Sequence, residues 1–243
     1  MSVDSSGVIA DEGIISKIRS HVYASFFNLK NPVSTAAGFL EIIRHAPNGS
    51  RILDVGCGDG LYYTYDKAVS TIKQKGLTIH SIDIDAGAIP ICKERIKKSG
   101  LSDCVTSEAK DLLDLTPETI DAKYDIVLFM ESFPVISRDL MTRLIAKACT
   151  LGKEVHLYHN LVEEKGWFLS WFKPKIKYIS LVDFGALTSK KEQEDIISQD
   201  WGITDFTIEP LLECKYGEMH WLLNIPIVRE YKITQYLVSL RYK

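Results

Sequence analysis

A short apolar run that leads into three alternating glycines is the feature that most constrains this chain. The run is RILDV at residues 51–55, and it continues into Gly56, Gly58 and Gly60. Because glycine has no Cβ, such a loop turns sharply and lets the backbone approach a ligand closely. The spacing differs from the G-x-G-x-x-G pattern of dinucleotide-binding loops, since the third glycine comes one position early and Asp54 precedes the first. Carboxylates around this turn favour a ligand with a cationic group and no phosphate.

Predicted strands and helices alternate along the chain from this loop onward. The run YDIVLFM is continuously apolar, which is typical of a strand buried on both faces of a parallel sheet. Right-handed connections between parallel strands place helices on both faces, so the pattern predicts a doubly wound α/β sheet with its ligand beyond the C-terminal strand ends. The predicted strands are residues 51–55, 77–83, 103–107, 124–130 and 155–158, and the predicted helices are 61–75, 86–98 and 138–149.

The alternation breaks after the fifth strand. Residues 162–187, which contain GWFLSWFKPKIKYISLVDFG, are longer than an ordinary connection of about two to six residues and predict a lid or substrate-binding insertion. A helix at 189–199 and a sixth strand at 203–211 are predicted to follow. Two segments could form the last strand of the sheet: HWLLNI at 220–225 and ITQYLVSLRY at 233–242. The second is favoured because its alternation of apolar and polar residues is longer.

These segments predict one domain with a mostly parallel, seven-stranded sheet. Its parts are a helical cover (1–49), a core (50–160), the insertion (162–187) and the C-terminal part of the sheet (188–243). The 243 residues are enough for one large core, and 46% apolar with 25% charged residues is an ordinary globular composition.

Charge, cysteine content and the chain's start narrow the classes of function. The net charge of -3 repels polyanions, so nucleic acid is disfavoured as a partner. The five cysteines include no C-x-x-C pair, so neither a disulfide framework, a zinc site nor another metal site is predicted, and a reducing compartment is indicated. The first residues lack the order of a signal peptide, and no apolar run approaches about 18 residues; the expectation is a cytoplasmic protein without a transmembrane segment.

The stretch from Asp54 to Gly60 resembles the first motif of the class I S-adenosylmethionine-dependent methyltransferases, an acid followed by G-x-G-x-G. The resemblance covers about residues 50–160. It implies a Rossmann-like methyltransferase fold, S-adenosyl-L-methionine as cofactor and S-adenosyl-L-homocysteine as product. In that family the glycine loop lies against the methionine part and the ribose of the cofactor, which implies contacts from Asp54, Gly56, Cys57, Gly58 and Gly60.

The resemblance also implies acids after the second and third strands. Asp83 occupies the family's ribose-binding position, where an ionised carboxylate can accept both hydroxyl protons of a diol; Asp85 competes for this role. Asp111 matches the acid that contacts the adenine amino group, although Lys110 stands where the family more often has glycine, and the alternative is a solvated loop acid. The neighbouring cofactor contacts implied in this way are Ile84, Leu112 and Met130.

Candidate acceptor residues follow the fourth and fifth strands. Glu131 could orient a cationic acceptor, hold the ammonium of the cofactor or face water, and His159 could accept a proton or be structural. Trp167 and Trp171 are predicted to line an aromatic lid, for which membrane-surface contact through residues 167–177 is the alternative. In the N-terminal cover, Tyr23 and Phe27 are candidates to contact the bound molecules, and packing in the core is the alternative.

Methylation of a small molecule, an amine in particular, is the predicted function. The order of the glycine-loop core, the aromatic insertion and a late helix is similar to that of small-amine N-methyltransferases such as histamine N-methyltransferase. Two alternatives stay open: methylation of a protein side chain, and a cofactor-binding but inactive partner subunit of a methyltransferase complex. The acceptor atom and the oligomeric state do not follow from the sequence.

Overall fold

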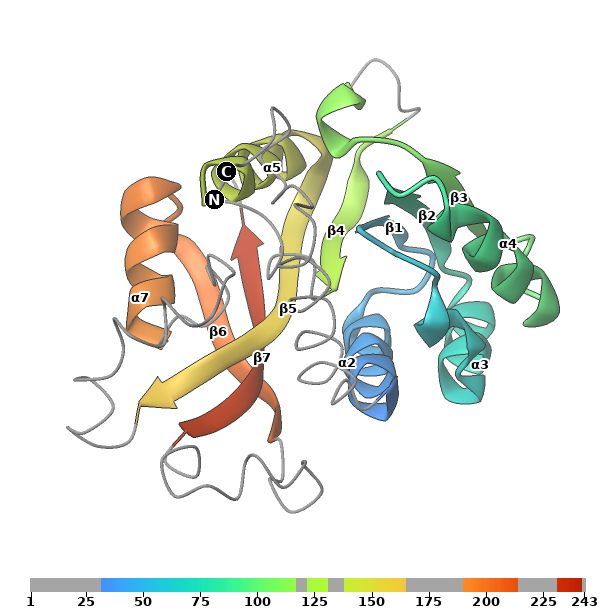
Figure 1. Ribbon diagram of the computed structural model, residues 1–243, viewed down its shortest axis with the longest axis horizontal. Helices are drawn as coiled ribbons and strands as arrows, with labels where there is room; N and C mark the ends of the chain where they lie inside the picture. Colours follow the sequence, from blue (N-terminus) through green and yellow to red (C-terminus); the bar gives the residue numbers. More distant parts are fainter. Residues whose placement is uncertain (1–31, 117–121, 131–137, 165–189, 214–230, 242–243) are drawn as a thin grey trace, which may run out of the picture.

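A seven-stranded sheet with the order β3-β2-β1-β4-β5-β7-β6 organises the molecule (Figure 1). The computed structural model describes residues 32–116, 122–130, 138–164, 190–213 and 231–241. Strands β1 to β5 are parallel, and β7 runs antiparallel to both β5 and β6. The predicted doubly wound, mostly parallel seven-stranded sheet is therefore confirmed. The strands are β1 (Arg51–Val55), β2 (Thr78–Asp83), β3 (Val105–Ala109), β4 (Tyr124–Met130), β5 (Gly152–Glu164), β6 (Asp205–Glu213) and β7 (Tyr231–Arg241).

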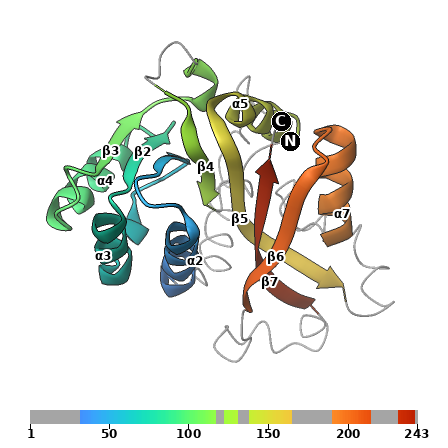
Figure 2. The same ribbon diagram turned by 180° about the vertical axis from the view of Figure 1, so that it is seen from behind.

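Helices cover both faces of this sheet and enclose two apolar layers. On one face α2 (Pro32–His45), α3 (Asp66–Lys75) and α4 (Ala88–Lys98) form an apolar layer with residues of β1 to β5, and the view from behind shows the three helices together (Figure 2). On the other face α5 (Arg138–Leu151) contributes buried residues to the second layer, and the π-helical turn η5 (Ile196–Asp200) that follows α7 (Lys190–Asp195) adds to it. Alternate residues of the central strands point into opposite layers, as the period of two requires.

Several predicted boundaries differ from the observed ones. The helix predicted at 61–75 is two elements, the short 3-10 helix η1 (Leu61–Thr64) and α3, because Tyr65 between them has an extended backbone with ψ 116°. Strand β3 begins two residues later than predicted, and β5 continues to Glu164, three residues into the segment predicted as an insertion. The last strand is the favoured alternative, but β7 lies between β5 and β6 rather than at the sheet edge.

The contact between α2 and β5 depends on a glycine. A Cβ built on Gly38 would lie 2.4 Å from Cζ of Tyr158, whose side chain is completely buried. We expect Gly38→Ala to lower the free energy of unfolding by about 1 to 3 kcal/mol, because the ring or the helix must shift. Urea denaturation measures this change. An increase in stability, as alanine gives at an uncrowded helix position, would show that α2 does not press against β5.

Candidate functional site

The glycine loop follows β1 and has the left-handed backbone conformation that glycine adopts readily. Gly56, Gly58 and Gly60 all have positive φ, at 74°, 53° and 66°. The amides of Gly56 and Cys57 both donate to the carbonyl of Ile82, at 2.8 and 3.2 Å, so the loop is tied to the end of β2. A Cβ built on Gly58 meets no atom within 4 Å, whereas one on Gly60 would lie 2.5 Å from Sγ of Cys92. Gly58 therefore borders open space, and Gly60 presses against the body of the protein.

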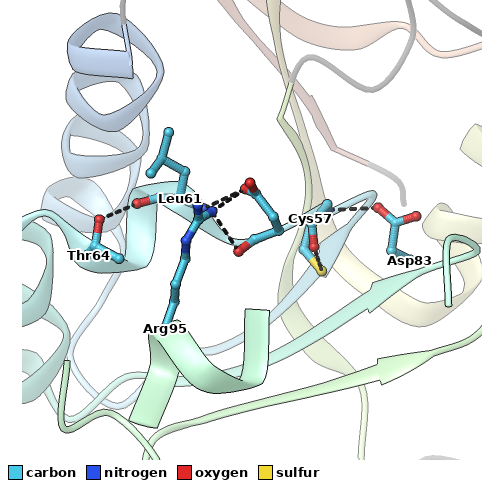
Figure 3. Close-up of polar contacts among 7 residues, drawn as sticks. Cys57, Leu61, Thr64, Asp83 and Arg95 are labelled. Atoms are coloured by element: carbon cyan, nitrogen blue, oxygen red, sulfur yellow. Dashed lines mark hydrogen bonds and ion pairs between the residues drawn. The ribbon is translucent and has the colours of Figure 1, made fainter. Parts of the chain in front are cut away.

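Asp83, the last residue of β2, holds this loop with its carboxylate. Its Oδ2 accepts a hydrogen bond from the amide of Gly58 at 2.7 Å (Figure 3). Its Oδ1 accepts one from the amide of Asp85 at 2.8 Å. The Asp85 carboxylate instead accepts from the amide of Gly87. Between the two competing acids, only Asp83 is hydrogen-bonded to the glycine loop. Ile84 beside it is 61% exposed.

A backbone hydrogen bond joins the C-terminal ends of β2 and β3, at the edge of the sheet where the glycine loop lies. The amide of Lys110 donates to the carbonyl of Asp83 at 2.9 Å, which places Asp111 near that acid along the edge. One carboxylate oxygen of Asp111 accepts from the amide of Leu113 at 2.9 Å and caps the short turn η2 (Leu112–Asp114). Leu112 is buried, as is Met130 at the end of β4. The structure thus gathers the predicted glycine loop and the two acids at the C-terminal ends of neighbouring strands.

Asp54 lies beneath the loop in a hydrogen-bonded network of tyrosines. Its Oδ2 accepts from the hydroxyls of Tyr62 at 2.5 Å and Tyr63 at 2.6 Å, while Oδ1 is buried and has no hydrogen-bond partner among the residues that the structure describes. The Tyr63 hydroxyl is also 2.6 Å from that of Ser81 on β2. Such an unpaired buried oxygen is uncommon and indicates a missing donor.

Burial raises the pKa of Asp54 from 3.8 to about 6, against the opposing effect of the tyrosine hydrogen bonds. Between these two values the folded chain binds more protons than the unfolded chain, so stability falls as the pH rises from about 4 to 6. The ionised carboxylate destabilises the fold by an amount on the order of 3 kcal/mol. A group retained against stability in this way is a candidate for function.

Arg95 and Cys92, both on α4, contact the glycine loop at Asp59 and Gly60. The guanidinium of Arg95 pairs with the carboxylate of Asp59 at 2.5 Å and donates to its carbonyl at 3.0 Å (Figure 3). A thiol hydrogen bond with Cys92, together with burial, raises the pKa of Cys57 far above its ordinary value, so this thiol is not a ready nucleophile. Sequence reasoning missed Arg95, Tyr62 and Tyr63, because none of them belongs to a motif with the glycines.

Of the residues predicted to bind the acceptor, the structure describes the backbone of one, His159. Glu131, Tyr23, Phe27, Trp167 and Trp171 lie outside the described residues. His159 belongs to β5, where its backbone is opposite Tyr236 of β7, and nothing is described of its side chain. His156, three residues earlier on β5, is hydrogen-bonded to Glu154 at 3.0 Å. Burial lowers the pKa of His156, as is typical of a structural histidine.

Other features of the described ranges lie apart from the loop. A hollow of about 410 Å³ is lined by residues such as Arg51, His80 and Tyr124, and by none of the predicted cofactor contacts. Within these ranges no three His, Cys, Asp or Glu residues are arranged to hold a metal ion. Of the helices that the structure describes, none has the length and apolar character needed to cross a bilayer.

Comparisons with known proteins agree with this geometry. Residues 52–154 match a family model described as a methyltransferase domain. The ribosomal protein L11 methyltransferase of Thermotoga petrophila is 24% identical over 144 residues, which are 57% of this chain and 52% of that protein. The chain thus spans about half the length of the curated relatives that it matches.

Solved structures share the fold at low identity. The S-adenosylmethionine-dependent methyltransferase SibL in its apo form has a TM-score of 0.57 and 17% identity, over 96% of this chain and 60% of SibL. Geranyl diphosphate C-methyltransferase from Streptomyces coelicolor A3(2), in complex with Mg²⁺, geranyl diphosphate and S-adenosyl-L-homocysteine, has a TM-score of 0.56 and 15% identity, over 98% and 88% of the two chains. The fold is therefore that of the Rossmann-like methyltransferases.

Proposed function

We propose that this chain, whose residues 52–154 match the methyltransferase domain family and whose fold is that of S-adenosylmethionine-dependent methyltransferases, transfers a methyl group from S-adenosylmethionine to a small-molecule acceptor, in particular an amine. The observation that carries the proposal is the hydrogen bond between the Gly58 amide and the Asp83 carboxylate. It brings the glycine loop and an acid on the neighbouring strand to one edge, with open space beside Gly58. This arrangement fits a ligand that has a sugar diol and a cationic end.

The residues of the loop and strand ends each have a proposed role toward the cofactor. Asp83 would accept the ribose hydroxyls with lone pairs not used by the two amides, and Asp111 would accept from the adenine amino group. Ile84, exposed at the end of β2, would pack against the base together with Leu112. Asp54, with its unpaired Oδ1, would face the ammonium end. The contacts that complete this set are Gly56, Cys57, Gly58, Gly60 and Met130.

When bound, S-adenosylmethionine supplies a methyl group that its sulfonium already activates. The chain mainly has to align the acceptor and exclude water. An amine acceptor needs only to be neutral. Glu131, which follows β4, and His159, which lies within β5, are proposed to orient the amine or to accept its proton. Trp167 and Trp171 in the insertion, and Tyr23 and Phe27 in the N-terminal cover, are proposed to line the acceptor pocket. The single-domain organisation predicted above belongs to the same proposal.

Methylation of a protein side chain is the second candidate. The favouring observation is the similarity to a protein named for methylation of ribosomal protein L11, although this chain covers only 52% of it. A catalytically inactive partner subunit would share the cofactor site, so turnover, not binding, separates that alternative from an enzyme.

Calorimetric titration of the purified chain with S-adenosylmethionine and S-adenosylhomocysteine tests the cofactor. Micromolar binding of both ligands is expected, and absence of binding would overturn the proposal. A methyl-transfer screen over amines, phenols and peptides then tests the acceptor. Turnover of a small amine supports the leading candidate, and turnover of peptides alone supports the second. Binding without turnover of either class would contradict methylation of a small amine and would favour a macromolecular acceptor or a missing partner.

A further inference from the structure

We propose that Tyr62 and Tyr63 are positioning residues that keep Asp54 ionised and leave its Oδ1 free for the cationic end of the cofactor. This inference rests on the proposed function and adds two residues that belong to no motif of the glycine loop. Both tyrosines lie in η1, directly after Gly60, and both side chains are buried. Their hydroxyls converge on the same carboxylate oxygen, Oδ2, at 2.5 and 2.6 Å.

The direction of each hydrogen bond in the network follows from its chemistry. An ionised carboxylate only accepts, so both tyrosine hydroxyls donate to Asp54. Since the single proton of Tyr63 is used there, the Ser81 hydroxyl must donate to the Tyr63 oxygen. Burial and the Asp54 charge raise the pKa of both tyrosines well above 10, so they remain donors at every physiological pH. The network is built to stabilise negative charge.

Among the residues that the structure describes, no positively charged side chain pairs with the Asp54 carboxylate. Asp83 on β2 raises the pKa of Asp54 through like-charge repulsion. The hydrogen bond between the thiols of Cys57 in the loop and Cys92 on α4 raises the pKa of Cys57 and lowers that of Cys92, and neither thiol can carry a positive charge. The ring of Phe39 on α2 packs against both tyrosine rings, with centroid distances of 4.7 Å to Tyr62 and 5.5 Å to Tyr63. A cationic ligand is therefore the partner that would complete this site, and the tyrosines are the groups that keep the acid charged until it arrives.

The test is the affinity for S-adenosylmethionine between pH 5 and 7.5, a range in which an α-amino group is mostly protonated. Affinity of the unaltered chain should fall as the pH drops through the pKa of Asp54, near 6. Tyr62→Phe and Tyr63→Phe should each move this midpoint up by about one pH unit or more, since each removes a hydrogen bond to a charged group. At the highest pH of the range, each variant should recover much of its lost affinity.

Three controls separate this role from a structural one. Tyr65→Phe removes a hydroxyl outside the network and should leave the midpoint unchanged. Asp54→Asn should bind weakly with no midpoint near 6. 5′-Methylthioadenosine, which has the nucleoside but no ammonium, should bind each variant with no such midpoint.

The outcomes are distinguishable from failure of the proposed function. Equal loss of affinity at every pH in the phenylalanine variants would show a merely structural role and overturn the inference. An unshifted midpoint would do the same. If the unaltered chain binds no S-adenosylmethionine at any pH, the proposed function itself fails. In that case carboxyl ¹³C NMR titration of the unliganded chain and of both variants still tests whether the tyrosines hold the pKa of Asp54 down.

Discussion

Asp83→Ala is expected to weaken S-adenosylmethionine binding by about 2 to 4 kcal/mol, or roughly 30- to 1,000-fold in Kd. Two losses combine in this variant. The ribose hydroxyls lose a charged acceptor, and the Gly58 amide loses the carboxylate that holds the loop at 2.7 Å. Calorimetric titration measures the change, and circular dichroism checks that the variant is folded.

Asp83→Asn and Asp85→Ala are the matched variants. Asparagine retains an oxygen for the Gly58 amide but not the charge, so we expect an intermediate loss. Asp85→Ala removes an acid whose carboxylate, among the described residues, accepts a hydrogen bond from the Gly87 amide and none from the glycine loop, so we expect little change in Kd. Unchanged affinity in Asp83→Ala, with a loss in Asp85→Ala, would transfer the ribose contact to Asp85.

Gly60→Ala is expected to lower the free energy of unfolding by about 2 to 5 kcal/mol. The backbone at Gly60 has φ 66° and ψ 32°, a left-handed conformation that disfavours a Cβ. That Cβ would also lie 2.5 Å from Sγ of Cys92 and 3.0 Å from a ring carbon of Tyr63. Since whole domains are stable by about 5 to 15 kcal/mol, urea denaturation should show a clearly weakened chain.

A double-mutant cycle separates the two causes of this loss. Gly60→Ala combined with Cys92→Ala removes the sulfur in the way, so the pair should be less destabilising than the sum of the single changes. Gly58→Ala has the same backbone strain, at φ 53°, but no neighbouring atom within 4 Å, and should destabilise the fold less while affecting binding more. Equal destabilisation by Gly58→Ala and Gly60→Ala would show that Cys92 does not restrict the loop.

Much of the proposed cofactor site could be predicted from the sequence, because residues that follow successive parallel strands in the chain also lie side by side in the fold. The carboxyl ends of parallel strands meet at one edge, so an acid at the end of the second strand falls beside a glycine loop at the end of the first. Asp83 and Gly58 are hydrogen-bonded as this argument implies. The continuous apolar run of β4 likewise identified a central strand from residue type alone.

The acceptor side was less accessible to this argument. Glu131 and the aromatic residues of the insertion were chosen by their order after the core, and no spacing rule relates them to the glycine loop. They lie outside the described residues, so their roles stay proposals. The observed β5 extends to Glu164 in a pairing with β7, so residues 162–164 belong to a strand and not to the predicted insertion.

By itself, the sequence determined where strands β1 to β5 occur along the chain, and it identified the glycine loop and the acids at the strand ends. Each of these features depends on local periodicity or on a motif. Only the tertiary structure decided the pairing of β7 between β5 and β6, which joins residues 154–164 to 231–241. It also decided that Tyr62 and Tyr63 turn inward to Asp54 and that Arg95 pairs with Asp59. The physical reason is that a strand pairing or a hydrogen bond to a buried charge depends on residues far apart in the chain that come into contact only in the folded protein. Local sequence patterns carry no information about those contacts.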